Sequence, residues 1–272
     1  MTSSKIMFFE KNKADLENTS CSITITDSVA SNNGQSFVNF MRDRKNYTAW
    51  MTTDSTDAAL TQLDIDLGDV ISFNSILLIG HNLKNYTIQY LSGVSWINFS
   101  TPINPTNDTN STSYHSFNSV NAQKIRIVIN GTQVVNADKI IKQLIITNLM
   151  GQFKAWPTIK NPTIDTQKKN SKMLSGKLRV LETNESFSCK LDVRNWRIQE
   201  DITLVEKIYF KREGVLLWIN ANDSTQFYLD MKGYRKEDIF LVRPTDDYNP
   251  ELVSGVYSNG IKLNIAFEEV IS

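Results

Sequence analysis

Residues 62–68 read Gln-Leu-Asp-Ile-Asp-Leu-Gly, and residues 76–80 read Ile-Leu-Leu-Ile-Gly. Successive side chains of a β-strand point to opposite faces of the sheet. The alternation of 62–68 therefore predicts a strand with Leu63, Ile65 and Leu67 on a buried face and the acids on the other face. We expect Gly68 to end this strand. Two more strands are predicted, over Ser75–Ile79 and over Tyr86–Tyr90, where alternation returns.

The rest of the chain repeats this pattern. Segments of four to eight residues rich in β-branched and aromatic side chains are separated by clusters of Gly, Asn, Asp and Ser, which predicts an all-β protein. Two helical segments are expected, at Gln35–Arg44 and as a short turn near Asn136–Ile140. Asn104–Ser116 is polar and is predicted to be a long loop.

The composition of the segments divides the chain into parts. We predict an N-terminal extension over residues 1–19, a first β-domain over 20–153, a linker over 154–172 and a second β-domain, a barrel or sandwich, over 173–272. In the linker, prolines disfavour regular strand pairing and lysines favour solvent. In the second domain, hairpins are expected over 207–219 and 255–267, because each has a glycine turn between two apolar segments.

Composition excludes several classes of function. The 272 residues include 29 basic and 29 acidic side chains. With no basic excess to neutralise phosphates, nucleic-acid binding is not expected. No apolar run approaches the roughly 20 residues that span a bilayer, so membrane insertion is not expected. The apolar run Ile6–Phe9 is shorter than the roughly 7–15 residues of a signal-peptide core, so export by that route is not expected.

The first domain resembles the discoidin-type (galactose-binding-like) family over about residues 20–153. The matching features are a tryptophan before the first strand, the strand ending in Asp-Leu-Gly, a glycine after the next strand, a second tryptophan and two closing apolar strands: Trp50, Ile65-Asp66-Leu67-Gly68, Gly80, Trp96, Lys124–Ile129 and Lys142–Thr147. The resemblance implies a jelly-roll sandwich that binds a ligand and does not catalyse.

The same resemblance implies a ligand surface on loops at one end of the sandwich. Candidate residues are those whose rings could stack on a sugar or whose polar groups could bond its hydroxyls: Asn46, Tyr47, Trp50, His81, Asn82 and Tyr114. For Trp50 and Trp96 a place in the core is the alternative.

Discoidin-like domains can also hold a structural Ca²⁺ through loop oxygens, for which Asp54 and Asp57 are candidates. No dense run of Asp and Asn supports such a site, so we expect no metal and no cofactor.

The second domain resembles bacteriophage tail-tip and distal-tail-type proteins. The likeness lies in Gly233–Val242, Tyr257 and the closing Phe267-Glu268-Glu269-Val270. It implies a non-enzymatic structural component of a phage or phage-like tail, assembled in the host cytoplasm. Its partners would be further copies of itself in a ring, other tail proteins and a host-surface glycan. The alternative is a carbohydrate-binding module protein of a bacterial surface or secreted system.

No catalytic motif is present, and no catalytic residue is expected. The two histidines, His81 and His115, fall in predicted loops, and Asp64 and Asp66 fall on a predicted solvated strand face. Cys189 lies in an alternating segment, which indicates a buried thiol and not a nucleophile.

Overall fold

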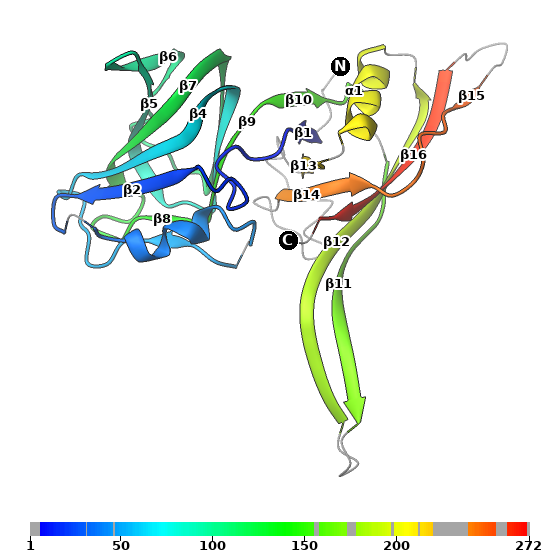
Figure 1. Cartoon of the computed structure of the whole chain (residues 1–272), viewed down its shortest axis with the longest axis horizontal. Coiled ribbons are helices and arrows are strands. Elements are labelled where there is room, and N and C mark those ends of the chain that lie inside the picture. The colour runs from blue at the N-terminus through cyan, green and yellow to red at the C-terminus, as the bar shows by residue number, and fades with distance from the viewer. Residues whose placement is uncertain are drawn as a thin grey trace. The chain divides into compact units, whose positions relative to one another are not determined.

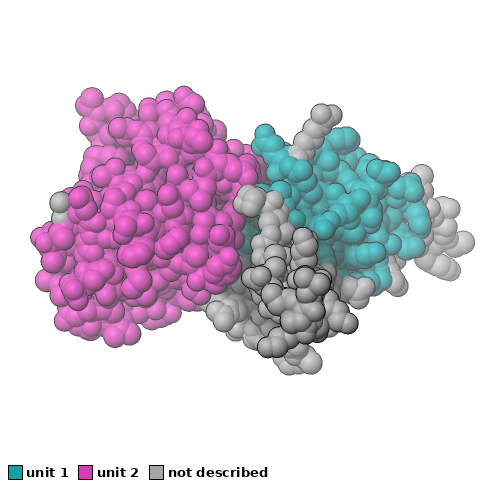
Figure 2. All heavy atoms as spheres, turned by 60° about the horizontal axis from the view of Figure 1, so that its bottom comes forward, with its two compact units in different colours: residues 1–9, 150–272 teal, residues 10–149 magenta. Residues whose placement is uncertain are grey.

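The computed structural model describes residues 6–30, 32–45, 47–154, 158–172, 178–196, 199–211, 213–219, 239–253 and 260–270. The described residues lie mostly in β-strands, as predicted. The chain forms two compact units, one of residues 10–149 and the other of residues 1–9 together with 150–272 (Figure 2). Each unit has its own hydrophobic core.

The unit of residues 10–149 is a jelly-roll β-sandwich (Figure 1). Its six-stranded sheet has the order β2-β4-β7-β5-β6, and β9 pairs with β4 outside this order. The bounds are β2 Ser22–Asp27, β4 Thr61–Ile79, β5 Leu83–Ser92, β6 Ser95–Ile103, β7 Thr112–Thr132 and β9 Gln143–Thr147. The 3₁₀ helix η1, Gln35–Met41, and a small sheet of β3, Trp50–Met51, with β8, Ile140–Ile141, complete it.

The predicted alternation in β4 is confirmed. Leu63, Ile65 and Leu67 are buried in the core of this unit. On the other face, Asp64 pairs with Arg126 and Asp66 with Lys124 of the neighbouring strand β7. The acids therefore form cross-strand ion pairs on the outer face, while the aliphatic side chains fill the sandwich.

Gly68 does not end the strand, contrary to expectation. It has a φ of +87° inside β4, and the pairing of β4 with β7 shifts register between Asp66 and Ile71. A Cβ atom at this position would lie 2.5 Å from the Cβ of Ser20. Glycine is therefore used here for a bulge that lets one long strand pair with β2 in its first half and with β9 in its second half.

The predicted irregular segments differ in detail. The helix expected over 35–44 is the shorter η1, and the segment near Asn136–Ile140 is a turn with Asn136 at a φ of 59°. The loop expected over Asn104–Ser116 ends where β7 begins, at Thr112. Tyr114 and His115 are consequently strand residues.

As far as it is described, the other unit consists of an eight-stranded sheet and the helix α1. The strand order is β10-β1-β13-β14-β16-β12-β11, with β15 paired to β16. The bounds are β1 Met7–Phe9, β10 Leu149–Gln152, β11 Thr158–Lys172, β12 Leu178–Trp196, α1 Gln199–Phe210, β13 Val215–Trp218, β14 Ile239–Pro244, β15 Glu251–Val253 and β16 Gly260–Glu269. Helix α1 buries Leu204, Val205 and Ile208 in the core of this unit.

The domain boundaries of the structure differ from the predicted ones at both ends of the sandwich. Residues 7–9 are not part of a free extension, because they form β1 and pair with β13. Most of the predicted linker is strand β11, which pairs with β12. The pairing shifts register between Lys160 and Thr163, around Pro162, so an irregularity accommodates the proline that argued against a strand.

The hairpin predicted over 207–219 is wrong in its first half. Lys207–Phe210 is the last turn of α1, and only 215–218 is a strand. Leu204, Val205 and Ile208 have the spacing of one helix face. This helical periodicity extends over more residues than the alternation of 207–211, and the segment is therefore helical. Of the hairpin predicted over 255–267, the structure describes only the second strand, which is part of β16 and pairs with β15. Its first strand and its turn, residues 255–259, lie outside the described residues, as does Gly233–Asp238.

Candidate ligand-binding surface of the N-terminal domain

Tyr47 is the most exposed of the predicted ligand-binding residues that the structure describes. Its side chain is 79% exposed, in the turn that follows η1. Asp43 shapes this turn, because its Oδ1 accepts hydrogen bonds from the backbone N–H of Lys45 at 2.9 Å and from Thr48 Oγ1 at 2.9 Å. The exposed ring of Tyr47 is therefore flanked by Lys45 and Thr48, both of which are bonded to Asp43.

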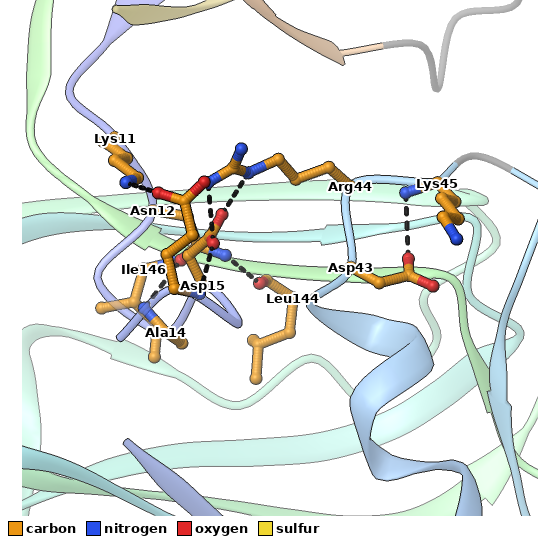
Figure 3. A network of polar contacts seen from close by, with 10 residues as sticks. Lys11, Asn12, Ala14, Asp15, Asp43, Arg44, Lys45, Leu144 and Ile146 are labelled. Atoms are coloured by element: carbon orange, nitrogen blue, oxygen red, sulfur yellow. Dashed lines mark hydrogen bonds and ion pairs between the residues drawn. The ribbon is translucent and has the colours of Figure 1, made fainter. Parts of the chain in front are cut away.

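Arg44 anchors the same turn. Its backbone has a φ of 63°, a conformation that residues other than glycine rarely adopt. Its guanidinium binds both carboxylate oxygens of the buried Asp15, at 2.5 and 2.8 Å, and reaches Glu17 at 2.9 Å (Figure 3). Burial lowers the pKa of Arg44, but the bonds to Asp15 outweigh this effect and raise it.

The acidic side of this ion pair is itself fixed to the sandwich. The Asn12 side chain donates to Leu144 O at 2.9 Å and accepts from the backbone N–H groups of Ala14, at 3.0 Å, and Ile146, at 2.9 Å (Figure 3). The segment that carries Asp15 is thus tied to β9. A chain of polar contacts from β9 to Arg44 holds the Tyr47 turn in place.

A pair of exposed aromatic rings precedes this turn. Phe37 and Phe40 lie three residues apart on η1, and residues three apart eclipse in a 3₁₀ helix. Their rings stack with centroids 5.9 Å apart, and the side chains are 36% and 39% exposed. This pair could not be predicted, because nothing in the sequence shows which face of so short a helix is buried.

The other predicted residues have places that differ from the expected loop surface. Trp50 is fully buried in the core, so the alternative reading is confirmed for it. The side chain of Asn82 binds two backbone groups before and in β8. Its Nδ2 donates to Asp138 O at 2.7 Å, and its Oδ1 accepts from Ile140 N–H at 2.8 Å. Tyr114 lies half-buried on β7, and Asn46 lies outside the described residues. Trp96, for which a core place was the alternative, is half-buried and stacks under the guanidinium of Arg126 at 4.0 Å.

His81 belongs to a buried polar cluster at the start of β5. Its Nδ1 accepts from Leu83 N–H at 3.1 Å, so Nε2 carries the proton and donates to Ser113 Oγ at 2.9 Å. Ser113 Oγ donates to Asp108 Oδ2 at 2.5 Å, and the hydroxyl of Tyr86 donates to the same oxygen at 3.0 Å. His115 contacts the Tyr86 hydroxyl at 3.0 Å through Nε2.

This cluster does not have the arrangement of a hydrolase triad. In a triad the histidine lies between the serine and the acid and accepts the serine proton. Here Ser113 lies between His81 and Asp108 and gives its proton to the acid. Burial lowers the pKa of His81 and of His115 to about 4, so both rings are neutral near neutral pH. The cluster is arranged as a structural hydrogen-bond network.

Two further groups bear on chemistry. Burial raises the pKa of the Cys189 thiol to about 12, which agrees with the predicted unreactive thiol. Among the described residues, no group of three or more His, Cys, Asp or Glu side chains could hold a metal ion.

Comparison with known proteins gives the family of the first domain. Residues 24–140 match the F5/8 type C domain family. The N-terminal region is an F5/8 type C domain. This confirms the discoidin-type resemblance, whereas no comparison supports a likeness of the second unit to tail proteins.

Solved structures with similar folds include carbohydrate-binding modules. The chitosan-binding module 1 of a chitosanase/glucanase from Paenibacillus sp. IK-5 matches at 18% identity and a TM-score of 0.38, covering 50% of this chain and 98% of the module. The family 32 module of NanJ from C. perfringens, solved with galactose, matches at 16% identity and a TM-score of 0.39, covering 52% and 98%. A GH29 fucosidase from Ruminococcus gnavus matches at 18% identity and a TM-score of 0.39, covering 51% of this chain but 27% of the enzyme.

No curated protein matches the chain. Within the part of the chain that the structure describes, no helix has the length and apolar character needed to cross a membrane.

Proposed function

We propose that the F5/8 type C domain is a non-catalytic module that binds carbohydrate through the Tyr47 turn. The observation that carries this proposal is the exposed Tyr47 ring on a turn that Arg44 and Asp15 hold in place. Aromatic rings stack on the apolar faces of sugars, and a turn that is anchored before binding loses little conformational freedom when a ligand arrives. Phe37 and Phe40 supply two further exposed rings on the preceding helix.

The first expected result concerns Tyr47→Ala. We expect the affinity of the full chain for its glycan to fall at least about tenfold, because the largest exposed ring of the surface is lost. Isothermal titration calorimetry with a glycan that the wild type binds measures this change. Phe210→Ala is the matched control, since Phe210 is 76% exposed but lies on α1 of the other unit.

Neither substitution should unfold the protein, because both side chains are mainly in solvent. An unchanged affinity in Tyr47→Ala would place the ligand elsewhere. An equal loss of affinity in Phe210→Ala would show that the glycan site is not confined to the F5/8 type C domain.

A second proposal concerns the other unit, and one structural observation favours it. Strands β11 and β12 pair with each other out to Lys172 and Leu178, but β16 joins β12 only from Ser188 onward. Within the described residues, the outer part of this hairpin has no third strand, and Figure 1 shows it extending away from the sheet. A two-stranded ribbon with free edges is marginally stable alone and is suited to strand pairing with another chain.

We infer from this arm that the second unit assembles with further copies of itself, in a ring of cyclic symmetry. A ring-shaped oligomer of this kind would suit a structural component of a phage or phage-like tail, in which the chain would contact other tail proteins. The F5/8 type C domain would then present its glycan surface to the host cell. The bacterial surface module remains the alternative, in which the protein works as a monomer.

Native mass, measured by light scattering on the full chain, tests the assembly. Rings are expected for the wild type. A monomer is expected when a short turn replaces residues 166–185, because the cut falls beyond the pair Asp165–Ser186 and removes only the outer ribbon. A monomeric wild type, or rings that survive the shortening, would contradict the role given to the arm.

A further inference from the structure

Lys139 is fully buried at the end of the sandwich where β4 begins. Its ammonium nitrogen lies 2.6 Å from Ser55 Oγ, 3.0 Å from Thr56 O and 2.9 Å from Ala59 O. All three oxygens belong to the loop between β3 and β4. A positive charge thus sits at the centre of an oxygen set contributed by a loop about 80 residues away in sequence.

The hydrogen-bond directions require the charged form of Lys139. Two of its partners are carbonyl oxygens, which only accept. The third, Ser55 Oγ, directs its own proton to Asp27 Oδ2 at 3.4 Å and therefore also accepts from Lys139. Three acceptors need three N–H donors, which an ammonium has and a neutral amine lacks.

Carboxylates surround this charge. Burial lowers the pKa of Lys139, and the charges of Asp27, Asp57 and Asp138 only partly offset this. Burial would raise the pKa of Asp27, but hydrogen bonds from Thr61 and Val29 and the charge of Lys139 outweigh this and lower it. The ammonium and these acids therefore each favour the charged form of the other inside the loop end.

The same loop end is where the family resemblance implies calcium, through Asp54 and Asp57. Calcium takes six to eight oxygen ligands around one ion. Here the centre of the oxygen set is filled by Lys139, and Asp57 Oδ1 accepts from Thr132 N–H at 3.0 Å and Thr132 Oγ1 at 2.7 Å. Asp138 Oδ1 accepts from Thr52 Oγ1 at 3.2 Å and Ser55 N–H at 2.9 Å. The residues present do not fit a calcium ion.

We propose that the ammonium of Lys139 takes the place of a bound divalent cation, so that this F5/8 type C domain keeps its loop end folded without calcium. The ammonium joins the loop of residues 52–60 to the start of β8. A covalently attached cation cannot dissociate, so the loop conformation is independent of calcium concentration. This inference stands apart from the glycan proposal, because none of these residues lies on the Tyr47 turn.

Hydrogen exchange of the full chain, read by mass spectrometry over a peptide containing residues 52–61, tests this inference. In the wild type we expect the same exchange with a chelator as with millimolar calcium. In Lys139→Met, which keeps the apolar stem and removes the charge, we expect exchange roughly 100-fold faster, because three oxygens lose a charged donor. Lys45→Met, at an exposed position, should leave this peptide unchanged.

Slower exchange of the wild type in calcium would overturn the proposal. Retained protection in Lys139→Met would also overturn it, since the stem alone would then hold the loop. The calcium comparison on the wild type needs no variant, so the proposal stays falsifiable even if Lys139→Met does not fold.

Discussion

Replacing Arg44 with alanine is expected to lower the free energy of unfolding of the F5/8 type C domain by about 4 kcal/mol. Removing one partner of a buried ion pair costs about 3–5 kcal/mol, because the other charge is left without compensation. The side chain of Asp15 is 3% exposed, so it cannot recover water as a partner. The substitution should also free the Tyr47 turn, since that turn has lost its anchor to the segment tied to β9.

Chemical denaturation of the full chain, monitored by hydrogen exchange of peptides from β4 and β7, measures this loss of stability. A double-mutant cycle with Asp15→Ala separates the pair from its surroundings. The double variant should be less destabilised than the sum of the two single variants. Lys124→Ala is the control: its pair with Asp66 is half-exposed and should contribute less than about 1 kcal/mol. Additive losses at Arg44 and Asp15 would show that the two residues are not coupled.

The second large effect is a loss of stability in mild acid. Burial lowers the pKa of His81 and of His115 to about 4, and the nearby Asp108 only partly offsets this. Unfolded histidine titrates near pH 6.5, so the unfolded chain binds protons first. The stability contributed by the neutral rings is fully present above about pH 6.5 and is lost as the pH falls towards about 4. At about pH 5 the loss should be roughly 2–4 kcal/mol for the two rings together.

Unfolding midpoints of the domain measured across this pH range test the prediction. His81→Gln should remove about half of the pH dependence, because one of the two rings no longer titrates. Burial acts to raise the pKa of Asp108, but its hydrogen bonds outweigh this effect and lower it. Asp108 therefore does not titrate in the pH range in which the histidines do. A stability that does not change between about pH 7 and pH 4.5 would contradict the cluster as described.

Local pattern predicted much of the sandwich. The period of two in β4 identifies its buried face, because the alternation of Leu63, Ile65 and Leu67 with acids is a property of adjacent residues. Gly68 did not predict where β4 ends, since a glycine with positive φ can end a strand or bend it. Only the pairing of both halves of β4 with β7 distinguishes the two outcomes.

Long-range pairing explains most of what the sequence analysis missed. Residues 7–9 and 158–172 become strands because partners far along the chain complete them, which no local pattern reveals. Tyr47 could be predicted as an exposed ring, but not its anchor, which joins Arg44 to Asp15 across 29 positions. Lys139 gave no signal at all, because its role depends on three oxygens of a distant loop.

Binding of the intact chain to a glycan array, with Tyr47→Ala applied in parallel, shows whether the Tyr47 turn recognises carbohydrate. We expect the wild type to be retained on a defined set of glycans and Tyr47→Ala not to be retained. Retention of both proteins on the same glycans, or of neither protein on any glycan, would contradict carbohydrate recognition by the Tyr47 turn.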